Sequence, residues 1–174
     1  SGGLVGSEMC IRDSPSEAPL IDHAIITHSH IDHIGMAPWL VGHHGTTLHG
    51  SRLTSGLSEI MWRDTYKVSS IEGYPLAWDR RDLDAALEAW QEHDMDEEFS
   101  IGSWNAKFHV AGHIPGAVMT EIDALGKKVL WTGDMDTRSS PNVSGALAVP
   151  CDILCLEGTY GGKYHPDRSE EEER

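Results

Sequence analysis

Four potential metal ligands within six residues constrain this chain more than any other feature of its sequence. They are His28, His30, Asp32 and His33, and the apolar run at 24–26 before them predicts a short buried strand. Residues two apart on a strand point to the same side, so His28 and His30 can reach one metal ion. Apolar residues at helical spacing follow, which places Asp32 and His33 at a strand-to-helix turn, where they could hold a second ion. The alternative is a histidine-rich surface loop without metal.

A histidine and an aspartate later in the chain occupy positions that suit further ligands. His113 lies in a glycine-containing loop between predicted strands, and Asp134 directly follows a strand. Imidazole and carboxylate ligands without a thiolate favour Zn²⁺, although Mn²⁺ is compatible with them. Three more histidines are interpreted as surface loop residues instead, namely His43, His44 and His49.

The remaining pattern predicts a mixed α/β chain with three helical regions. Helices are expected after the histidine motif to about residue 42, at 52–66 with Ser51 as N-cap, and at 79–92, and a loop is expected at 69–75. Each of the last two helices has an apolar stripe that is expected to face the core. The stripes consist of Leu53, Leu57, Ile60 and Met61 in one helix, and of Leu83, Ala86, Leu87 and Trp90 in the other.

Strands are predicted where β-branched and aromatic residues gather between turn residues. The predicted strands cover 21–27, 46–49, 99–109 with a break at Gly102-Ser103, 117–122, 127–132 and 151–156. The segments 117–122 and 127–132 are expected to form a hairpin around residues 123–126. A loop is expected at 139–150, and Cys151 and Cys155 on the last strand are expected to be buried thiols.

Length, composition and charge limit the size of the domain and the partners that it can have. A chain of 174 residues can form one ordinary domain, and residues 19–162 are expected to form it. No apolar run reaches the roughly 20 residues that cross a bilayer, and three cysteines give no disulfide framework, so we expect a cytoplasmic protein without a membrane partner. The formal net charge of −15 argues against this segment itself gripping nucleic acid. Residues 5–14 resemble translated sequencing-adapter read-through, and residues 1–18 are interpreted as a non-native or disordered tail.

The spacing His28-x-His30-x-Asp32-His33 resembles the signature of the metallo-β-lactamase superfamily, whose members are mostly two-metal hydrolases. The segment Glu157-Gly158-Thr159-Tyr160-Gly161 resembles part of its β-CASP branch, the RNA-processing nucleases similar to ribonuclease J and the cleavage-and-polyadenylation endonuclease. The resemblance implies a partial αββα sandwich that lacks the opening strands and the β-CASP insert. Residues 163–174 would then be the start of a linker into that insert.

The resemblance also implies roles for the candidate residues. The implied metal ligands are His28, His30 and His113 for one Zn²⁺, Asp32 and His33 for the other, and Asp134 for both. A hydroxide, which Asp32 helps to orient, would attack a phosphodiester bond of RNA. Glu157 would orient a catalytic histidine beyond this chain, so the fragment itself is expected to be inactive.

Three other functions are compatible with the motif. The first is a DNA-processing β-CASP nuclease, and the second is a small-molecule hydrolase similar to glyoxalase II, which the segment around Glu157 makes less fitting. The third is a non-catalytic metal-binding fragment or scaffold subunit, although the intact set of ligands disfavours a degenerate copy. The resemblance implies RNA as the partner of the full-length protein, and the sequence gives no oligomeric state.

Overall fold

The structure, a computed structural model, describes residues 20–159, 161 and 162. The predicted tail at 1–18 and the predicted linker at 163–174 lie outside the described residues, as does Tyr160. Within the described part, helices α2–α5 and strands β1–β8 form a mixed α/β fold with two sheets, as predicted. None of these helices has the length and hydropathy needed to cross a membrane.

The first sheet is parallel, and its strands alternate with helices. It contains β1 (His23–Ile25), β2 (Thr47–Gly50) and β3 (Trp90–Glu92), in that order. The connection from β1 to β2 contains α2 (Ile31–Ile34) and α3 (Ala37–His44), and the connection from β2 to β3 contains α4 (Arg52–Glu72) and α5 (Arg80–Glu88). Parallel neighbours need such crossovers, because a tight turn cannot return the chain to the same end of the sheet.

The second sheet is an antiparallel meander that ends in one parallel strand. It contains β4 (Glu98–Ile101), β5 (Trp104–Val110), β6 (Val118–Ala124), β7 (Lys127–Trp131) and β8 (Ile153–Cys155), with β8 parallel to β7. The predicted break at Gly102-Ser103 and the predicted hairpin are both confirmed. Leu125 and Gly126 at the hairpin turn have φ angles of 55° and 73°, as a two-residue type I′ turn requires.

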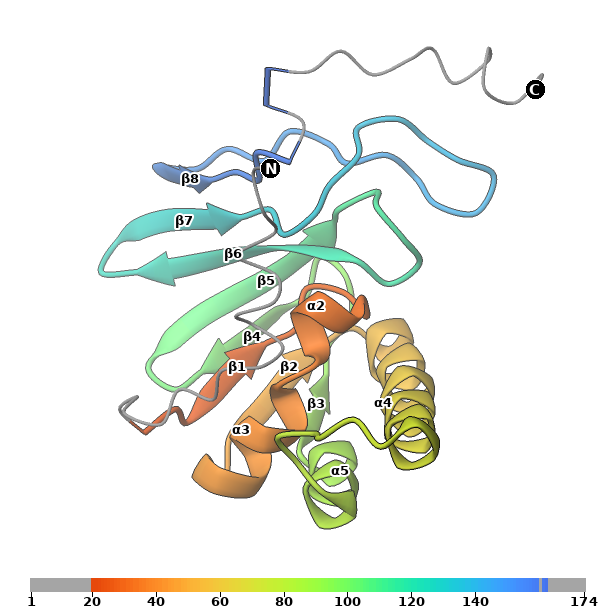
Figure 1. The fold of residues 1–174 in the computed structure, drawn as a ribbon. Coiled ribbons are helices and arrows are strands. Elements are labelled where there is room, and N and C mark those ends of the chain that lie inside the picture. Colours follow the sequence, from red (N-terminus) through yellow and green to blue (C-terminus); the bar gives the residue numbers. More distant parts are fainter. Residues whose placement is uncertain (1–19, 160, 163–174) are drawn as a thin grey trace, which may run out of the picture.

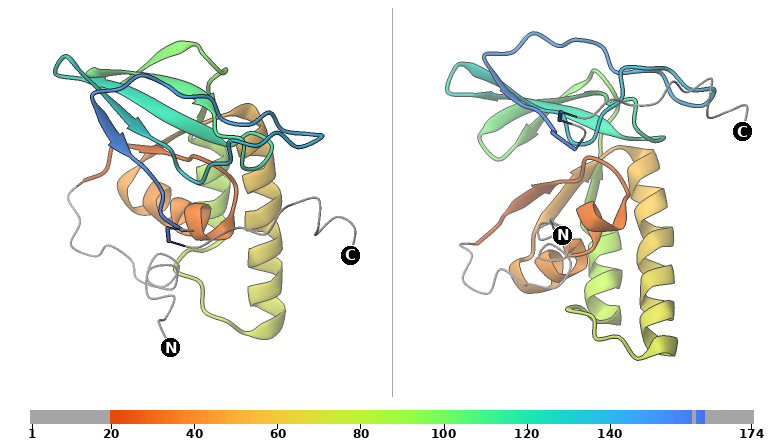
Figure 2. Two further views of the ribbon diagram at one scale, coloured as in Figure 1. Left: turned by 90° about the horizontal axis from the view of Figure 1, so that it is seen from above. Right: turned by 45° about the horizontal axis from the view of Figure 1, so that its top comes forward.

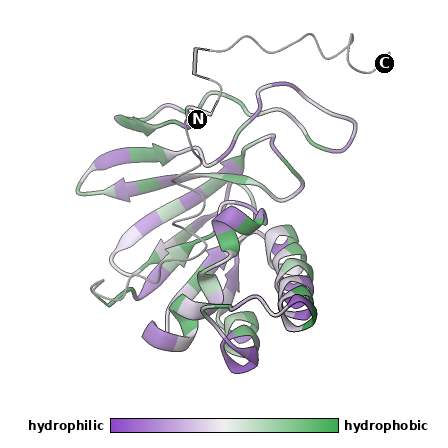
Figure 3. Cartoon of the chain, in the orientation of Figure 1, coloured by the Kyte–Doolittle hydropathy of each residue, from purple (hydrophilic) through white to green (hydrophobic). Residues whose placement is uncertain are grey.

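The two sheets and the helices form three layers. Figure 1 shows α2–α5 on one side of the three-stranded sheet and the five-stranded sheet on its other side, and both views of Figure 2 agree. Ile25 packs against Ile101, Ala106 and Ile122 between the sheets. Figure 3 shows hydrophobic and hydrophilic residues alternating along strands of the five-stranded sheet, so one face is turned to this core. The layers fit the predicted partial sandwich; within the described residues, no helix covers the outer face of the five-stranded sheet.

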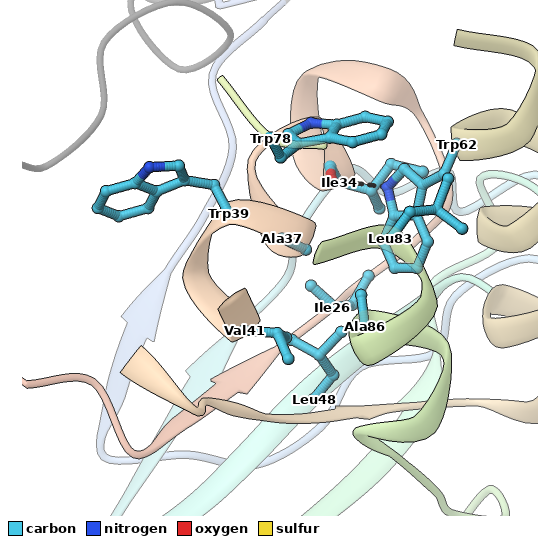
Figure 4. Close-up of a cluster of buried hydrophobic side chains, with 10 residues drawn as sticks. All are labelled: Ile26, Ile34, Ala37, Trp39, Val41, Leu48, Trp62, Trp78, Leu83 and Ala86. Carbon is cyan, nitrogen blue, oxygen red and sulfur yellow. Dashed lines mark hydrogen bonds between the residues drawn. The ribbon is translucent and has the colours of Figure 1, made fainter. Parts of the chain in front are cut away.

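The core beneath the helices holds the short helix α2 in place. Figure 4 shows Trp62 of α4 and Trp78 directed towards α2, and the Trp62 indole donates a hydrogen bond of 2.9 Å to the carbonyl of Ile34. The Trp78 indole donates one of 2.8 Å to the carbonyl of Gly35. Helix α2 has four residues and no side-chain N-cap, so it depends on this packing rather than on its own helix propensity.

Helix α4 corrects two predictions. It begins after the Ser51 N-cap, as expected, but it continues to Glu72 through the segment predicted as a loop. Its apolar stripe does not face the core, because Leu53 is 59% exposed and Ile60 is 62% exposed, and the buried side chains are Thr54, Ser58 and Trp62. The physical reason is a close contact at the helix start, where the hydroxyls of Ser51 and Thr54 both donate to the carbonyl of Gly116.

Three further predictions are wrong in part. The helix expected at 79–92 ends at Glu88, since Trp90–Glu92 pairs with β2 as strand β3. His43 and His44 form the last turn of α3, and His49 is a strand residue that is only 1% exposed, because β2 is the central strand of its sheet. Cys151 and Cys155 are only partly buried, because β8 is a three-residue strand at the edge of its sheet.

Candidate metal centre

The first two histidines of the motif lie just beyond the end of β1, where the chain passes between the sheets. The amide of Ile26 still donates to the carbonyl of His49 in β2, at 2.8 Å. The carbonyl of Thr27 accepts instead from the amide of Val118 in β6, at 2.9 Å. The segment is therefore tied to both sheets, and His28 is completely buried between them.

Four of the six predicted ligands converge on one small volume, and we call them the metal cluster: His28, His30, His113 and Asp134. Nε2 of His28 is 3.0 Å from Nδ1 of His30, and Nε2 of His113 is 3.1 Å from the same Nδ1. Oδ2 of Asp134 is 3.7 Å from Nε2 of His28 and 3.6 Å from Nε2 of His113. One ligand atom from each residue thus lies within 4.8 Å of the others. The cluster could hold a metal ion with four ligands.

The electrostatics keep His28 in the form that binds metal. Burial lowers the pKa of His28, and the imidazoles of His33, His30 and His113 lower it further, to about 3. The ring is therefore neutral at pH 7 and offers a lone pair to a metal ion. This donor set of three imidazoles and a carboxylate fits Zn²⁺ well.

The side chain of Thr27 contributes to the site, although sequence reasoning missed it. Its Oγ1 is 3.1 Å from Nδ1 of His28, so Nδ1–H can donate to the hydroxyl while Nε2 keeps its lone pair for the metal. Gly133, with a φ of +53°, lies directly against Thr27, since a Cβ at position 133 would be 2.8 Å from the Thr27 Cβ. The available signal was a hydroxyl residue immediately before the first histidine of the motif.

The other two predicted ligands, Asp32 and His33, lie beside the metal cluster on helix α2. Nε2 of His33 is 3.6 Å from Oδ1 of Asp134 and 3.8 Å from Oδ2 of Asp32. Asp134 therefore presents Oδ2 to the histidines of the cluster and Oδ1 to His33. This arrangement is compatible with two neighbouring metal positions that share Asp134.

Two loops carry His113 and Asp134, and backbone contacts join the loops. The amide of Asp136 donates to the carbonyl of Ala111 at 2.9 Å. Gly112, with a φ of +76°, allows this approach, because a Cβ at position 112 would be 2.0 Å from the carbonyl oxygen of Asp136. Both ligands follow strands of the five-stranded sheet, as the sequence predicted for them.

Glu157 lies next to the cluster but does not belong to it. A pocket of about 620 Å³ is lined by Glu157 together with His113 and Asp134. Oε1 of Glu157 accepts the amide hydrogen of Met135, at 2.9 Å. Burial alone would raise the pKa of Glu157, but hydrogen bonds from Met135 and Thr159 and the nearby His113 outweigh it, so the pKa lies below its usual range. The carboxylate is ionised at neutral pH.

Comparisons with known proteins place this geometry in a family. The model of the metallo-beta-lactamase superfamily matches residues 17–152. The chain is 31% identical to "Cleavage and polyadenylation specificity factor 73" of Drosophila melanogaster, over 99% of this chain and 26% of that protein. It is 31% identical to "Cleavage and polyadenylation specificity factor subunit 3" of Dictyostelium discoideum, over 91% of this chain and 21% of that protein. It is 28% identical to "Ribonuclease TTHA0252" of Thermus thermophilus, over 83% of this chain and 33% of that protein.

These relatives agree with the distant resemblance to β-CASP nucleases seen in the sequence. The chain spans between 21% and 33% of their lengths. The part that matches the family, residues 17–152, contains the metal cluster and the motif at 28–33, so the comparison bears on the metal site rather than on whole-protein activity.

Proposed function

The chain belongs to the metallo-β-lactamase superfamily, and we propose that it supplies the metal centre of a nuclease that hydrolyses phosphodiester bonds in RNA. The observation that carries this proposal is the convergence of three imidazoles and one carboxylate from three separate segments of the chain. The names of two kinds of relatives, polyadenylation factors and a ribonuclease, support RNA as the substrate. The coarser conclusion, a metal-dependent hydrolase domain, rests on the family alone.

The candidate ligands of this chain would form two neighbouring metal positions. When bound, Zn²⁺ lowers the pKa of water towards neutrality and withdraws charge from a phosphate oxygen. The metal cluster would hold one ion, and Asp32 and His33 would hold a second through their side of Asp134. Asp32 is 46% exposed, so its carboxylate can also accept a hydrogen bond from water and orient it. Mn²⁺ is a possible replacement for Zn²⁺ because every donor is nitrogen or oxygen.

The net charge limits what this segment does alone. A formal charge of −15 repels RNA, so the contacts that grip the substrate are expected to come from parts of the full-length protein outside this segment. We propose in addition that Glu157 orients a histidine of those parts, which would protonate the leaving oxygen. Residues 1–174 should accordingly bind about one zinc ion tightly and cleave RNA negligibly.

The test compares the full-length protein with two histidine variants on matched substrates. We expect the natural protein to cleave labelled single-stranded RNA, His30→Ala to lose both zinc and cleavage, and His43→Ala to retain both. His43 is the matched control because it is an exposed histidine on α3 outside the cluster.

Substrate classes are separated by offering DNA of the same sequence and a thioester. Cleavage of DNA but not RNA would move the proposal to a DNA-processing nuclease. Thioester hydrolysis without any nucleic-acid cleavage would replace it with a small-molecule hydrolase. Cleavage of RNA by His30→Ala at the wild-type rate would refute the assignment of the site.

A further inference from the structure

Asp134 lies beyond the end of β7, so no strand or helix fixes its side chain. Its direction depends on the peptide groups on either side of it. On one side, Gly133 is pressed against Thr27. On the other side, the amide of Met135 donates to Oε1 of Glu157 at 2.9 Å. The Met135 amide belongs to the same peptide plane as the Asp134 carbonyl, so this bond restricts the backbone of Asp134 directly.

Glu157 is itself held both at its backbone amide and at its carboxylate. Its backbone amide donates to the Thr132 hydroxyl at 3.2 Å, and this threonine pairs with Cys155 of β8 through a backbone bond of 3.1 Å. Its carboxylate accepts hydrogen bonds from Thr159 as well as from Met135. The side chain therefore spans from the end of β8 to the turn that carries Asp134.

We propose that Glu157 is a positioning residue that holds Asp134 in the direction needed for metal binding, through the amide of Met135. The inference rests on the metal centre proposed above, but it assigns Glu157 a task within this chain. The carboxylate of Glu157 is directed to the amide of Met135 and lies outside the metal cluster, so Glu157 supports a ligand rather than acting as one. Its effect on the metal is transmitted by the backbone between Asp134 and Asp136, which is also tied to Ala111 beside His113.

The chain offers a matched control at the opposite end of β8. Asp152 precedes this strand, and its Oδ2 accepts the backbone amide hydrogen of Lys128 in β7, at 2.9 Å. Both carboxylates thus flank β8 and accept a main-chain hydrogen bond from another segment, Glu157 from Met135 and Asp152 from Lys128. Only Glu157 does so next to a cluster residue. A general loosening of β8 would lower the zinc affinity equally when either carboxylate is removed, whereas a specific effect on Asp134 would appear only when Glu157 is replaced.

The experiment measures the zinc affinity of residues 1–174 by competition with a chelating dye. Glu157→Ala should weaken binding by about 10- to 100-fold, the usual effect of removing a partner that orients a metal ligand. Glu157→Gln keeps an oxygen that can accept from Met135 and should lose less than about threefold, and Asp152→Ala should bind as the wild type does. Wild-type affinity in Glu157→Ala, or equal losses in Glu157→Ala and Asp152→Ala, would overturn the inference.

Hydrogen exchange of the Met135 amide, measured without metal, gives a second and independent reading. Exchange should be slow in the wild type, faster in Glu157→Ala and unchanged in Asp152→Ala. If the wild-type chain bound no zinc, the proposed function would fail, and exchange would still decide whether Glu157 fixes the Met135 amide. Equal exchange in the wild type and Glu157→Ala would show that it does not.

Discussion

Two groups of histidines in this molecule look alike in composition and differ in geometry. One is the metal cluster. The other, which we call the histidine row, consists of His23 of β1, His49 of β2 and His93 just after β3. In both groups, ring nitrogens of neighbouring residues approach to about 3 Å: 3.0 and 3.1 Å in the cluster, and 3.0 and 2.9 Å in the row.

The difference lies in which nitrogens meet. In the row, His49 uses Nε2 towards His23 and Nδ1 towards His93, which are two different nitrogens of one ring, so the three imidazoles form a chain without a common point. In the cluster, Nδ1 of His30 faces both neighbouring histidines, and Asp134 adds a carboxylate oxygen. Of these two groups, only the metal cluster brings one ligand atom from each of its residues within 4.8 Å of the others.

Proton affinity does not separate the two groups. Burial is the largest cause of a lowered pKa in both, to about 3 for His28 and to about 4 for His49. A neutral buried imidazole is therefore necessary for a metal ligand but is not diagnostic of one. The convergence of donors with a carboxylate distinguishes the site from the structural row.

The largest expected effect comes from deleting one histidine in each group. His30→Ala removes a direct donor, so zinc affinity should fall by at least about 100-fold, since even indirect partners of ligands are worth 10- to 100-fold. His93→Ala should leave zinc affinity and stoichiometry unchanged. Isothermal titration of both variants with zinc checks the contrast, and a loss of zinc in His93→Ala would mean that the row also binds metal.

The row should make stability depend on pH in mildly acidic solution. The pKa of His49 is about 4 in the folded chain and 6.5 ordinarily, so below pH 6.5 the unfolded state binds a proton that the folded state refuses. Stability should therefore fall as the pH drops from 6.5 towards 4, by about 3 kcal/mol for this residue. His49→Gln should remove that part of the fall, as urea unfolding at pH 7 and pH 4.5 can measure.

Both chains in that comparison keep His28, so its titration contributes equally and cancels from the difference. The same pH dependence in the wild type and in His49→Gln would contradict the burial of a neutral imidazole at the centre of the row.

A smaller effect is expected from the hydroxyl that orients His28. Thr27→Val keeps the shape of the side chain but removes the acceptor 3.1 Å from Nδ1 of His28. Zinc affinity should fall by about tenfold. Thr46→Val is a suitable control, because Thr46 is a buried threonine that donates to the carbonyl of Ile21. If the two variants lose the same affinity, the hydroxyl of Thr27 has no specific role.

The smallest effect is expected at the end of the row that contacts the second sheet. The rings of His93 and Phe99 are stacked, with centroids 3.6 Å apart. His93→Ala should lower the free energy of unfolding by about 1 kcal/mol, as removal of an aromatic pair does. Thermal unfolding of the zinc-free chain at pH 7 measures it, and an unchanged midpoint would show that the stack is not stabilising.

The sequence predicted what local spacing determines. The strand-to-helix turn at 28–33, the hairpin with its turn at Leu125-Gly126, and the start of α4 at Ser51 are all set by residues close in the chain, and all are confirmed. His113 and Asp134 were assigned through family resemblance, because nothing local in a loop indicates that it meets residue 28. In the structure, the bond from the amide of Val118 to the carbonyl of Thr27 ties the end of the His113 loop to the motif, and the bond between Asp136 and Ala111 joins the two loops.

The errors occurred where distant segments decide the outcome. The sequence predicts a surface position for His49 because it does not show that β1 and β3 flank its strand. The face of α4 was misjudged because hydropathy favours Leu53 and Ile60, whereas the small hydroxyl side chain of Thr54 faces inward to bond with the loop at Gly116. The task of Glu157 within the chain could not be predicted either, because it depends on a main-chain amide 22 residues away.

The short helix α2 has a consequence for how quickly the site exchanges its ion. It carries Asp32 and His33, and its last turn is fastened by the indoles of Trp62 and Trp78. Trp62→Phe would leave the buried carbonyl of Ile34 without its donor, at a cost of about 1–3 kcal/mol. With that bond lost, the four-residue helix α2 should unfold locally more often than the sheets do. Release of metal would then be gated by a tryptophan in the hydrophobic core, and a substitution far from any ligand would shorten the residence time of the ion.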